Sequence, residues 1–505
     1  MPSQLLRTKS IDKLIADTAV EGHRLRKTLG PWSLAALGIG AIIGTGIFIL
    51  TGTAAAGEVL QVPSIWKAPV LDLILHGTSA MGTAGRPGAG PGIALSFLLV
   101  ALVCALAGLC YAELASMIPV AGSAYTYTYA TLGEIVAWII GWDLILEYAV
   151  SNMAVAVGFS AYIDSLLRNL GIHLPREFMG PMFVSGQRTG AYFNVPGFLI
   201  VMIITAVLVI GIRESAGANN FMVTVKIAAI LIFIIFAGRH IEPSNWTPFM
   251  PNGWQGVLTG GAIVFFTYIG FDSVSTAAEE CQNPQRDVPF GIIASLVICA
   301  VLYVSVAVVL TGIQHWQTLR NAAPVANALE AIGLHNIQRW VTVGALTGML
   351  SSLLVFQLGQ ARVWFSMSRD GLLPRVFSSV HPRFRTPHVS TVAAGLFVAI
   401  PAGIFDIGTL ADLSNIGTLF AFILVAVGVM VLRHRQPERR RGFRTPWVPV
   451  VPVLAILCCL TLMMSLPLET WARFVVWLAI GLVIYFSYSK ARSEFGSKPR
   501  AAGKS

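Results

Sequence analysis

Charged residues are scarce in this chain. Asp, Glu, Lys and Arg make up 11% of its 505 residues, and hydrophobic residues make up 55%. Soluble domains carry about 25% charged residues. The composition therefore excludes an ordinary soluble protein and predicts an all-α integral membrane protein that crosses the bilayer many times.

Several chemical signatures are also missing from the sequence. The six cysteines show no zinc-ligand spacing with histidine and no disulfide framework, so we expect no metal and no cofactor. No phosphate-binding P-loop is present, which argues against a pump driven by ATP. The nine histidines form no cluster of the kind that a membrane enzyme acting on lipid or sugar carriers would need. We therefore expect a protein that is not an enzyme.

Twelve apolar runs are long enough to cross a membrane, for which a helix needs ~20 apolar residues. They predict twelve transmembrane helices, and the boundary between the ninth and the tenth is the weakest. The runs are 32–56, 91–118, 131–167, 195–212, 219–238, 256–280, 289–312, 337–367, 389–405, 408–431, 446–466 and 470–489.

Lysine and arginine are distributed unevenly around these runs. If the N-terminus is cytoplasmic, 23 of them lie in cytoplasmic segments and seven in the opposite loops. The positive-inside rule then predicts a multi-pass protein of the plasma (inner) membrane with both termini in the cytoplasm. The net charge of +10 needs no nucleic acid as a partner, because the anionic inner leaflet of the lipid bilayer accounts for the basic run 433–444.

Residues 38–49, GIGAIIGTGIFI, place four glycines inside an apolar run. Each glycine weakens a helix by about 1 kcal/mol relative to alanine, so the stretch predicts a broken helix. A second stretch, FFTYIGFDSVST at 265–276, lies five runs later. Since five is odd, two halves of five helices would cross the membrane in opposite directions. Glycine-interrupted spans at matching positions of two such halves indicate the substrate site of a transporter.

Two other interpretations of the first glycine stretch must be weighed. Gly40 and Gly44 form a GxxxG pattern, which is typical of a helix-packing face, and this segment alone leaves that alternative open. A dinucleotide-binding loop would need a preceding strand and a surrounding βαβ unit, which the sequence does not offer.

Unwound backbone inside a bilayer persists only where it lines a cavity or meets a ligand. A zwitterionic amino acid carries the complementary groups. Its carboxylate accepts from free N–H groups at a helix N-terminus, and its ammonium donates to freed carbonyls. Glycine lets such a ligand approach the backbone closely. We therefore expect an amino acid as the substrate.

Ionisable residues inside apolar runs are candidates for function. A charge on Lys226, one to two turns into the fifth run, costs at least ~2.5 kcal/mol unless it is paired or faces water. Either this lysine snorkels to the interface, or burial lets it gain and lose a proton near neutral pH. Asp272 follows the break in the sixth run and is a candidate for the cavity. Glu113 lies near a run's end, and Asp143 and Glu147 lie one helical turn apart.

Four sequence blocks carry a resemblance that extends through nearly all of 30–490. Taken in their order along the chain, they resemble the amino acid–polyamine–organocation superfamily, and within it the cationic amino acid transporter branch. The chain thus resembles a bacterial amino acid permease. The blocks are GIGAIIGTGIF (38–48), YAELASMIPVAGSAYTY (111–127), FFTYIGFDSVSTAAEECQNPQRDVPFGI (265–292) and GQARVWFSMSRDGLLP (359–374).

The resemblance implies a LeuT-type fold, with twelve transmembrane helices in a 5+5 inverted repeat, broken helices 1 and 6, and two accessory helices. The outer loop 58–90 is longer than expected for close relatives, and we expect an ordered, plug-like loop without chemistry. The implied segments are a cytoplasmic tail (1–30), the first repeat (31–240), the second repeat (241–431), the accessory helices (432–490) and a second cytoplasmic tail (491–505).

The resemblance also implies the substrate-binding residues. The substrate carboxylate would meet backbone N–H groups and the hydroxyl at Thr45 and Gly46. The substrate ammonium would meet the carbonyls of Ile42, Phe266 and Ile269. The other implied members of the substrate site are Ile43, Gly44, the acidic residues Glu147 and Asp272, and Phe356, which limits side-chain room.

A proton-coupling site is implied in the same way. Lys226 resembles the lysine that replaces the sodium ion of sodium-coupled relatives. It would lie beside carbonyls near Gly40 and hydroxyls near Ser351 and Ser352. Protons would then be the coupling ion.

We therefore expect a secondary active transporter that takes up an amino acid with protons by alternating access. An amino acid exchanger is the alternative, and a polytopic membrane enzyme or a non-transporting sensor are distant ones. The substrate stays open, because bulky Phe356 favours small neutral amino acids whereas Asp272 and Glu147 favour cations.

Overall fold

The computed structural model of the chain is mostly helical in the residues that it describes. The tails predicted at 1–30 and 491–505, and the loop 58–90, lie partly outside these residues. The described residues are 4–18, 27, 29–59, 64–77, 85–169, 171–184, 187–210, 212–321, 323–384 and 386–493.

Nine helical segments within the described residues are long and apolar enough to cross a membrane, and three shorter apolar helices accompany them. Together they coincide with the twelve apolar runs of the sequence. The predicted boundary between the ninth and tenth runs is real, because one helix ends at Ala402 and the next begins at Ile407. The nine segments are Pro31–Ala56, Gly90–Met117, Glu134–Arg168, Gly217–His240, Gly253–Thr276, Pro284–Ile313, His335–Arg369, Leu410–Arg435 and Leu468–Arg492.

The α-helices and strands have the following bounds. They are α1 (Ile11–Thr18), α2 (Pro31–Ile42), α3 (Thr51–Ala56), β1 (Gly57–Val59), α4 (Val70–His76), β2 (Gly85–Pro87), α5 (Ile93–Met117), α6 (Ala124–Thr131), α7 (Glu134–Asn169), β3 (Phe183–Val184), β4 (Gln187–Arg188), α8 (Val195–Ile210), α9 (Ile212–Ala237), α10 (Gly253–Val264), α11 (Ser273–Thr276), α12 (Pro284–Ile313), α13 (Pro324–Ala331), α14 (His335–Arg369), α15 (His388–Ala402), α16 (Ile407–Arg435), α17 (Val450–Met464), α18 (Leu468–Ile484) and α19 (Lys490–Arg492).

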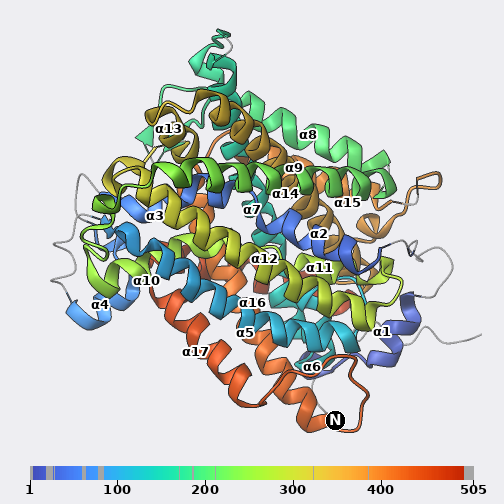
Figure 1. Cartoon of the computed structure of the whole chain (residues 1–505). Coiled ribbons are helices and arrows are strands. Elements are labelled where there is room, and N and C mark those ends of the chain that lie inside the picture. Colours follow the sequence, from blue (N-terminus) through green and yellow to red (C-terminus); the bar gives the residue numbers. More distant parts are fainter. Residues whose placement is uncertain are drawn as a thin grey trace, which may run out of the picture.

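The interior is built from long helices that pack side by side (Figure 1). The short helix α2 packs against α9, α12 and α14, while α7 packs against α14 and α16. Most of the residues from Pro31 to Ala56 and from Gly253 to Thr276 are buried. These two interrupted segments therefore lie inside a ring of other helices, where side chains and not lipid surround them.

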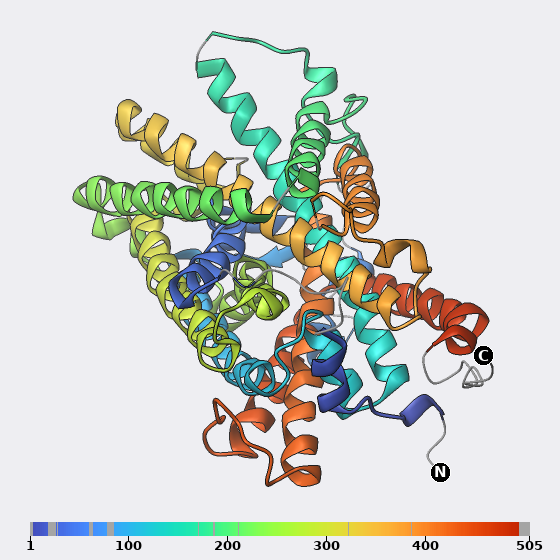
Figure 2. The ribbon, with the colours of Figure 1, turned by 90° about the vertical axis from the view of Figure 1, so that its right-hand side faces the viewer.

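The first and last described segments lie at the same end of the bundle (Figure 2). Lys9 Nζ lies 3.0 Å from Asp370 Oδ1, just beyond the end of α14. The hydroxyl of Ser489 donates to the carbonyl of Leu372 at 2.7 Å, two residues further along the same loop. This arrangement agrees with tails on one side of a membrane, while the compartment that they face stays a prediction.

The first glycine-rich segment is an interrupted helix. Helix α2 ends at Ile42, and Ile43 leaves helical angles with φ −81° and ψ 89°. Ile43 and Gly44 form a bend, and Thr45 is helical again with φ −61° and ψ −32°. One π-helical turn, η2 (Gly46–Leu50), then leads into α3. The break lies inside the stretch for which the sequence predicts it.

The second glycine-rich segment is interrupted as well. Helix α10 passes into a 3₁₀ turn, η9 (Phe265–Tyr268), and Ile269 is extended with φ −61° and ψ 137°. Gly270 follows with φ +119°, a backbone angle that side chains disfavour. A Cβ atom at Gly270 would lie 2.6 Å from Cβ of Ala41, so glycine also allows the two broken helices to approach each other.

The described part of the loop 58–90 is ordered by contacts to distant helices. Strand β1 pairs with β2 in an antiparallel sheet, and an ion pair joins Lys67 to Glu469. Arg86 is buried and binds both Asp412 of α16 and Glu58. Although burial opposes its charge, these carboxylates raise the pKa of Arg86 above its ordinary value. The described part of the loop is therefore held against this end of the bundle.

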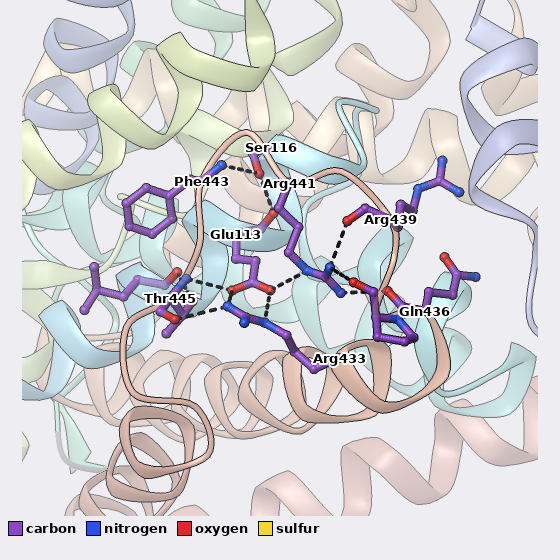
Figure 3. A network of polar contacts seen from close by, with 10 residues as sticks. Glu113, Ser116, Arg433, Gln436, Arg439, Arg441, Phe443 and Thr445 are labelled. Carbon is purple, nitrogen blue, oxygen red and sulfur yellow. Dashed lines mark hydrogen bonds and ion pairs between the residues drawn. The ribbon is translucent and has the colours of Figure 1, made fainter.

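The basic run 433–444 folds over the end of α5 (Figure 3). Glu113, which is 1% exposed, accepts two hydrogen bonds of 2.8 Å from Arg433 and one of 3.1 Å from Nε of Arg441. The backbone N–H of Thr445 donates to the same carboxylate at 2.7 Å. Two arginines for which the sequence predicts a lipid partner thus bind a protein carboxylate.

Candidate functional site

The two helix interruptions lie directly against each other. A Cβ atom at Gly46 would lie 2.6 Å from Cγ2 and 2.9 Å from Cα of Thr267. The hydroxyl of Tyr303, on α12, lies 2.8 Å from the carbonyl of Ile42 and 2.9 Å from that of Thr267. One hydroxyl has one proton, so it donates to one of these carbonyls at a time. The unwound segments therefore form one polar site with Tyr303 between them.

The residues around the first break are packed closely by α7 and α14. The hydroxyl of Thr45 faces the carbonyl of Val155 at 3.4 Å. A Cβ atom at Gly44 would lie 2.6 Å from Oγ of Ser352. On the second segment, the carbonyl of Phe266 accepts from the N–H of Ile269 at 3.3 Å, a long bond that a stronger donor could replace. The structure thus places both sets of predicted backbone groups in this region.

The predicted acidic and aromatic residues gather around Tyr148 of α7. The hydroxyl of Tyr148 donates to Asp272 Oδ2 at 2.5 Å, and its ring lies 6.3 Å from that of Phe356. Glu147 and Asp272 are each 1% exposed. Within the described part of the chain, no donor reaches either carboxylate oxygen of Glu147 or the second oxygen of Asp272. The site therefore holds buried acceptors that have no hydrogen-bond partner.

Lys226 lies on the other side of the first break and is fully buried. Its Nζ donates to the carbonyls of Gly40 and Ile43 at 2.9 Å each and to the hydroxyl of Ser351 at 3.4 Å. An ammonium has three N–H donors, and these three acceptors match them in number. The buried position contradicts the alternative in which this lysine snorkels to the interface. The amine ties α9 to α2 and to α14.

Ser352 shares the same carbonyls. Its hydroxyl lies 2.8 Å from the carbonyl of Gly40, 3.1 Å from that of Ala41 and 3.3 Å from that of Ile43. Both predicted serines therefore meet the unwound end of α2, but only Ser351 contacts the amine. No group of three His, Cys, Asp or Glu side chains in the described segments is placed to hold a metal ion.

A family comparison accounts for this architecture. The family described as "Amino acid permease" matches residues 29–486. The chain belongs to this family of amino acid permeases. The permease is therefore a multi-pass membrane transporter and not an enzyme.

Similar proteins cover almost the whole permease. It is 47% identical over 496 residues to "Branched-chain amino acid permease BcaP" of Bacillus subtilis (strain 168), which covers 98% of this chain and 99% of the relative. It is 44% identical over 491 residues to "Methylthioribose transporter" of the same organism, over 97% and 99%. It is 35% identical over 445 residues to "Cationic amino acid transporter 4, vacuolar" of Arabidopsis thaliana, over 86% and 68%.

Three residues of the permease site were not found by sequence reasoning. Tyr303 and Tyr148 are buried tyrosines inside apolar runs, and a tyrosine that is buried usually needs a hydrogen-bond partner. Asn219, which is 1% exposed, donates to the carbonyl of Ala36 and accepts from Ser351. A polar side chain at the start of an apolar run was the available signal, but its partners lie on distant helices.

Proposed function

We propose that the permease takes up an amino acid together with a proton across the plasma membrane by alternating access. Two inverted repeats, 31–240 and 241–431, would form a LeuT-type fold with the accessory helices 432–490, and both termini would face the cytoplasm. The observation that carries the proposal is the bridge from Lys226 to the unwound end of α2. A proton on this amine would hold α2 against α9 and α14.

The substrate would bind across the two interruptions. Its carboxylate would accept from N–H groups at Thr45 and Gly46, next to the helix that restarts there. Its ammonium would donate to carbonyls of Ile42, Phe266 and Ile269. The carbonyl of Ile42 accepts from the hydroxyl of Tyr303 at 2.8 Å, and the ammonium would take over this donor position.

Neutral, branched-chain amino acids are the proposed substrates. Two similar proteins, 47% and 33% identical, are named branched-chain amino acid permeases. Phe356 and Tyr148 supply an aromatic wall for an apolar side chain.

A ligand panel on the purified protein tests the substrate. We expect leucine, isoleucine and valine to raise the melting temperature more than the other amino acids, because a ligand that binds only the folded state stabilises it. Stabilisation by arginine or lysine alone would support the cationic alternative, and stabilisation by methylthioribose alone would contradict amino acid transport. Uptake into proteoliposomes that needs internal amino acid but no pH gradient would support the exchanger.

Asp272→Asn should alter recognition of the substrate more than folding. The change removes a negative charge beside the second break while an amide oxygen can still accept from Tyr148. We expect the order of affinities in the panel to change, with at least one apparent Kd shifted by about tenfold, or 1.4 kcal/mol. Asp164→Asn, which alters a carboxylate paired with Arg168 near the end of α7, is the control. An unchanged panel for Asp272→Asn would remove this residue from the pocket.

A further inference from the structure

We propose that Asn219 is a positioning residue that fixes the direction of the Ser351 hydroxyl and thereby favours the protonated form of Lys226. The proposal rests on the proposed proton coupling at this lysine. Asn219 and Lys226 are seven residues apart on α9, which places both on the same face of the helix. Asn219 and Ser351 are buried along with the amine.

The orientation of the Asn219 amide follows from a group that can only accept. A backbone carbonyl has no proton, so the carbonyl of Ala36, 3.3 Å away, requires the nitrogen of the amide to face it. The amide oxygen must then face Ser351, whose Oγ lies 2.7 Å away. Reversing the amide would place its oxygen against the carbonyl oxygen of Ala36, where neither atom can donate.

The direction of the serine hydroxyl follows in turn. Ser351 has one proton, and the amide oxygen of Asn219 accepts it. The hydroxyl therefore presents only lone pairs to Nζ of Lys226, 3.4 Å away. An ammonium can donate to those lone pairs, whereas a neutral amine would direct its own lone pair at an acceptor.

The other groups around the amine act in the same sense. The carbonyls of Gly40 and Ile43 on α2 can only accept. Cys299 of α12 is the titratable group that faces the amine, and the described parts of α2 and α14 bring no charged side chain to it. If Asn219 did not hold the hydroxyl, Ser351 could turn and donate to a neutral amine, whereas the thiol of Cys299 is only a weak donor.

The glycine stretch makes room for this arrangement. A Cβ atom at Gly40 would lie 2.7 Å from Oδ1 of Asn219 and 2.9 Å from Oγ of Ser351. Any side chain at this position would displace the pair. The absence of a side chain at Gly40 therefore leaves room for the contact between Asn219 and Ser351, and it lets α9 and α14 pack closely against α2.

The pH dependence of uptake into proteoliposomes tests the proposal. We expect Asn219→Leu to move the pH of half-maximal uptake toward acid by about one unit, a tenfold loss of proton affinity, since a hydrogen bond to a charged group is weakened. Asn219→Asp should move it toward alkaline pH, because a carboxylate keeps the acceptor and attracts the ammonium. Asn220→Leu, at the exposed neighbouring position, should leave it unchanged. Substrate-induced thermal shifts identify which variants are folded.

A double substitution separates positioning from a merely structural role. Ser351→Ala removes the hydroxyl, so Asn219→Leu should add no further shift in that background. The inference would be overturned if the shifts in the pH of half-maximal uptake add in the double variant. It would also be overturned if Asn219→Leu and Asn219→Asp shift this pH in the same direction, or if neither shifts it. The wild-type protein keeps the two proposals apart. Uptake independent of pH in the wild type would refute the proton coupling itself, whereas pH-dependent uptake that Asn219 does not alter would refute this inference alone.

Discussion

We expect Lys226→Ala to abolish the accumulation of substrate against its gradient. The amine joins the unwound end of α2 to α9 and α14, and its two carbonyl contacts are 2.9 Å long. A proton can couple to transport only if it biases the same conformational change that the substrate biases. Without the amine, the substrate concentration in proteoliposomes with an imposed pH gradient should rise only to the external concentration. The measurement is radiolabelled uptake over time.

Two further variants sharpen this result. Lys226→Arg should not restore accumulation, because arginine is larger and stays protonated. Binding of substrate should persist in Lys226→Ala, since the backbone groups at Thr45 and Gly46 are untouched, and a thermal shift would detect it. Lys13→Ala alters an exposed lysine of α1 and should transport as the wild type does. If Lys226→Ala accumulates substrate at the wild-type rate, coupling by this lysine is wrong and exchange becomes the better proposal.

Gly46→Leu should also eliminate uptake, while the amount of protein in the membrane stays near normal. The first side-chain carbon would lie 2.9 Å from the backbone of Thr267, so the two interrupted helices would have to separate. Since the proposed ligand binds between these segments, even Gly46→Ala should reduce uptake by at least about tenfold, which corresponds to ~1.4 kcal/mol. Initial rates and membrane protein levels are measured together.

Gly261→Ala provides the matched control for this substitution. Gly261 lies in α10, and a Cβ atom there would meet its nearest neighbours at 3.7 Å, an ordinary contact distance. Its uptake should equal that of the wild type, with helix propensity slightly improved. Wild-type uptake by Gly46→Leu would show that the interruption is not a binding site.

Much of this structure could be predicted from local sequence, because local rules produce it. Apolar runs of sufficient length gave the helices, and glycine clusters gave the interruptions at Ile43 and Gly270. Lys226 was noticeable because a charge in an apolar run is costly. These signals depend on residues close together in the chain.

The polar contacts between distant helices could not be predicted in this way. Tyr303 meets a carbonyl 261 residues away, and Tyr148 meets a carboxylate 124 residues away. Neither periodicity nor composition specifies which helix faces which. The partners of Asn219 and of Arg433 belong to the same class, since each is set by packing between helices and not by any pattern within one.

The carboxylate of Glu113 also has consequences for how the chain is made. Of the two arginines that bind it, Arg433 comes first in the chain, 320 residues after Glu113. At synthesis rates of about 5–20 residues per second, the ribosome needs roughly 16–64 s to reach it. During that interval α5 has already left the ribosome, and Glu113 lacks both of its arginine partners, Arg433 and Arg441. The final arrangement of this end of α5 is therefore a late event in biogenesis, completed only when the segment after α16 emerges and folds back.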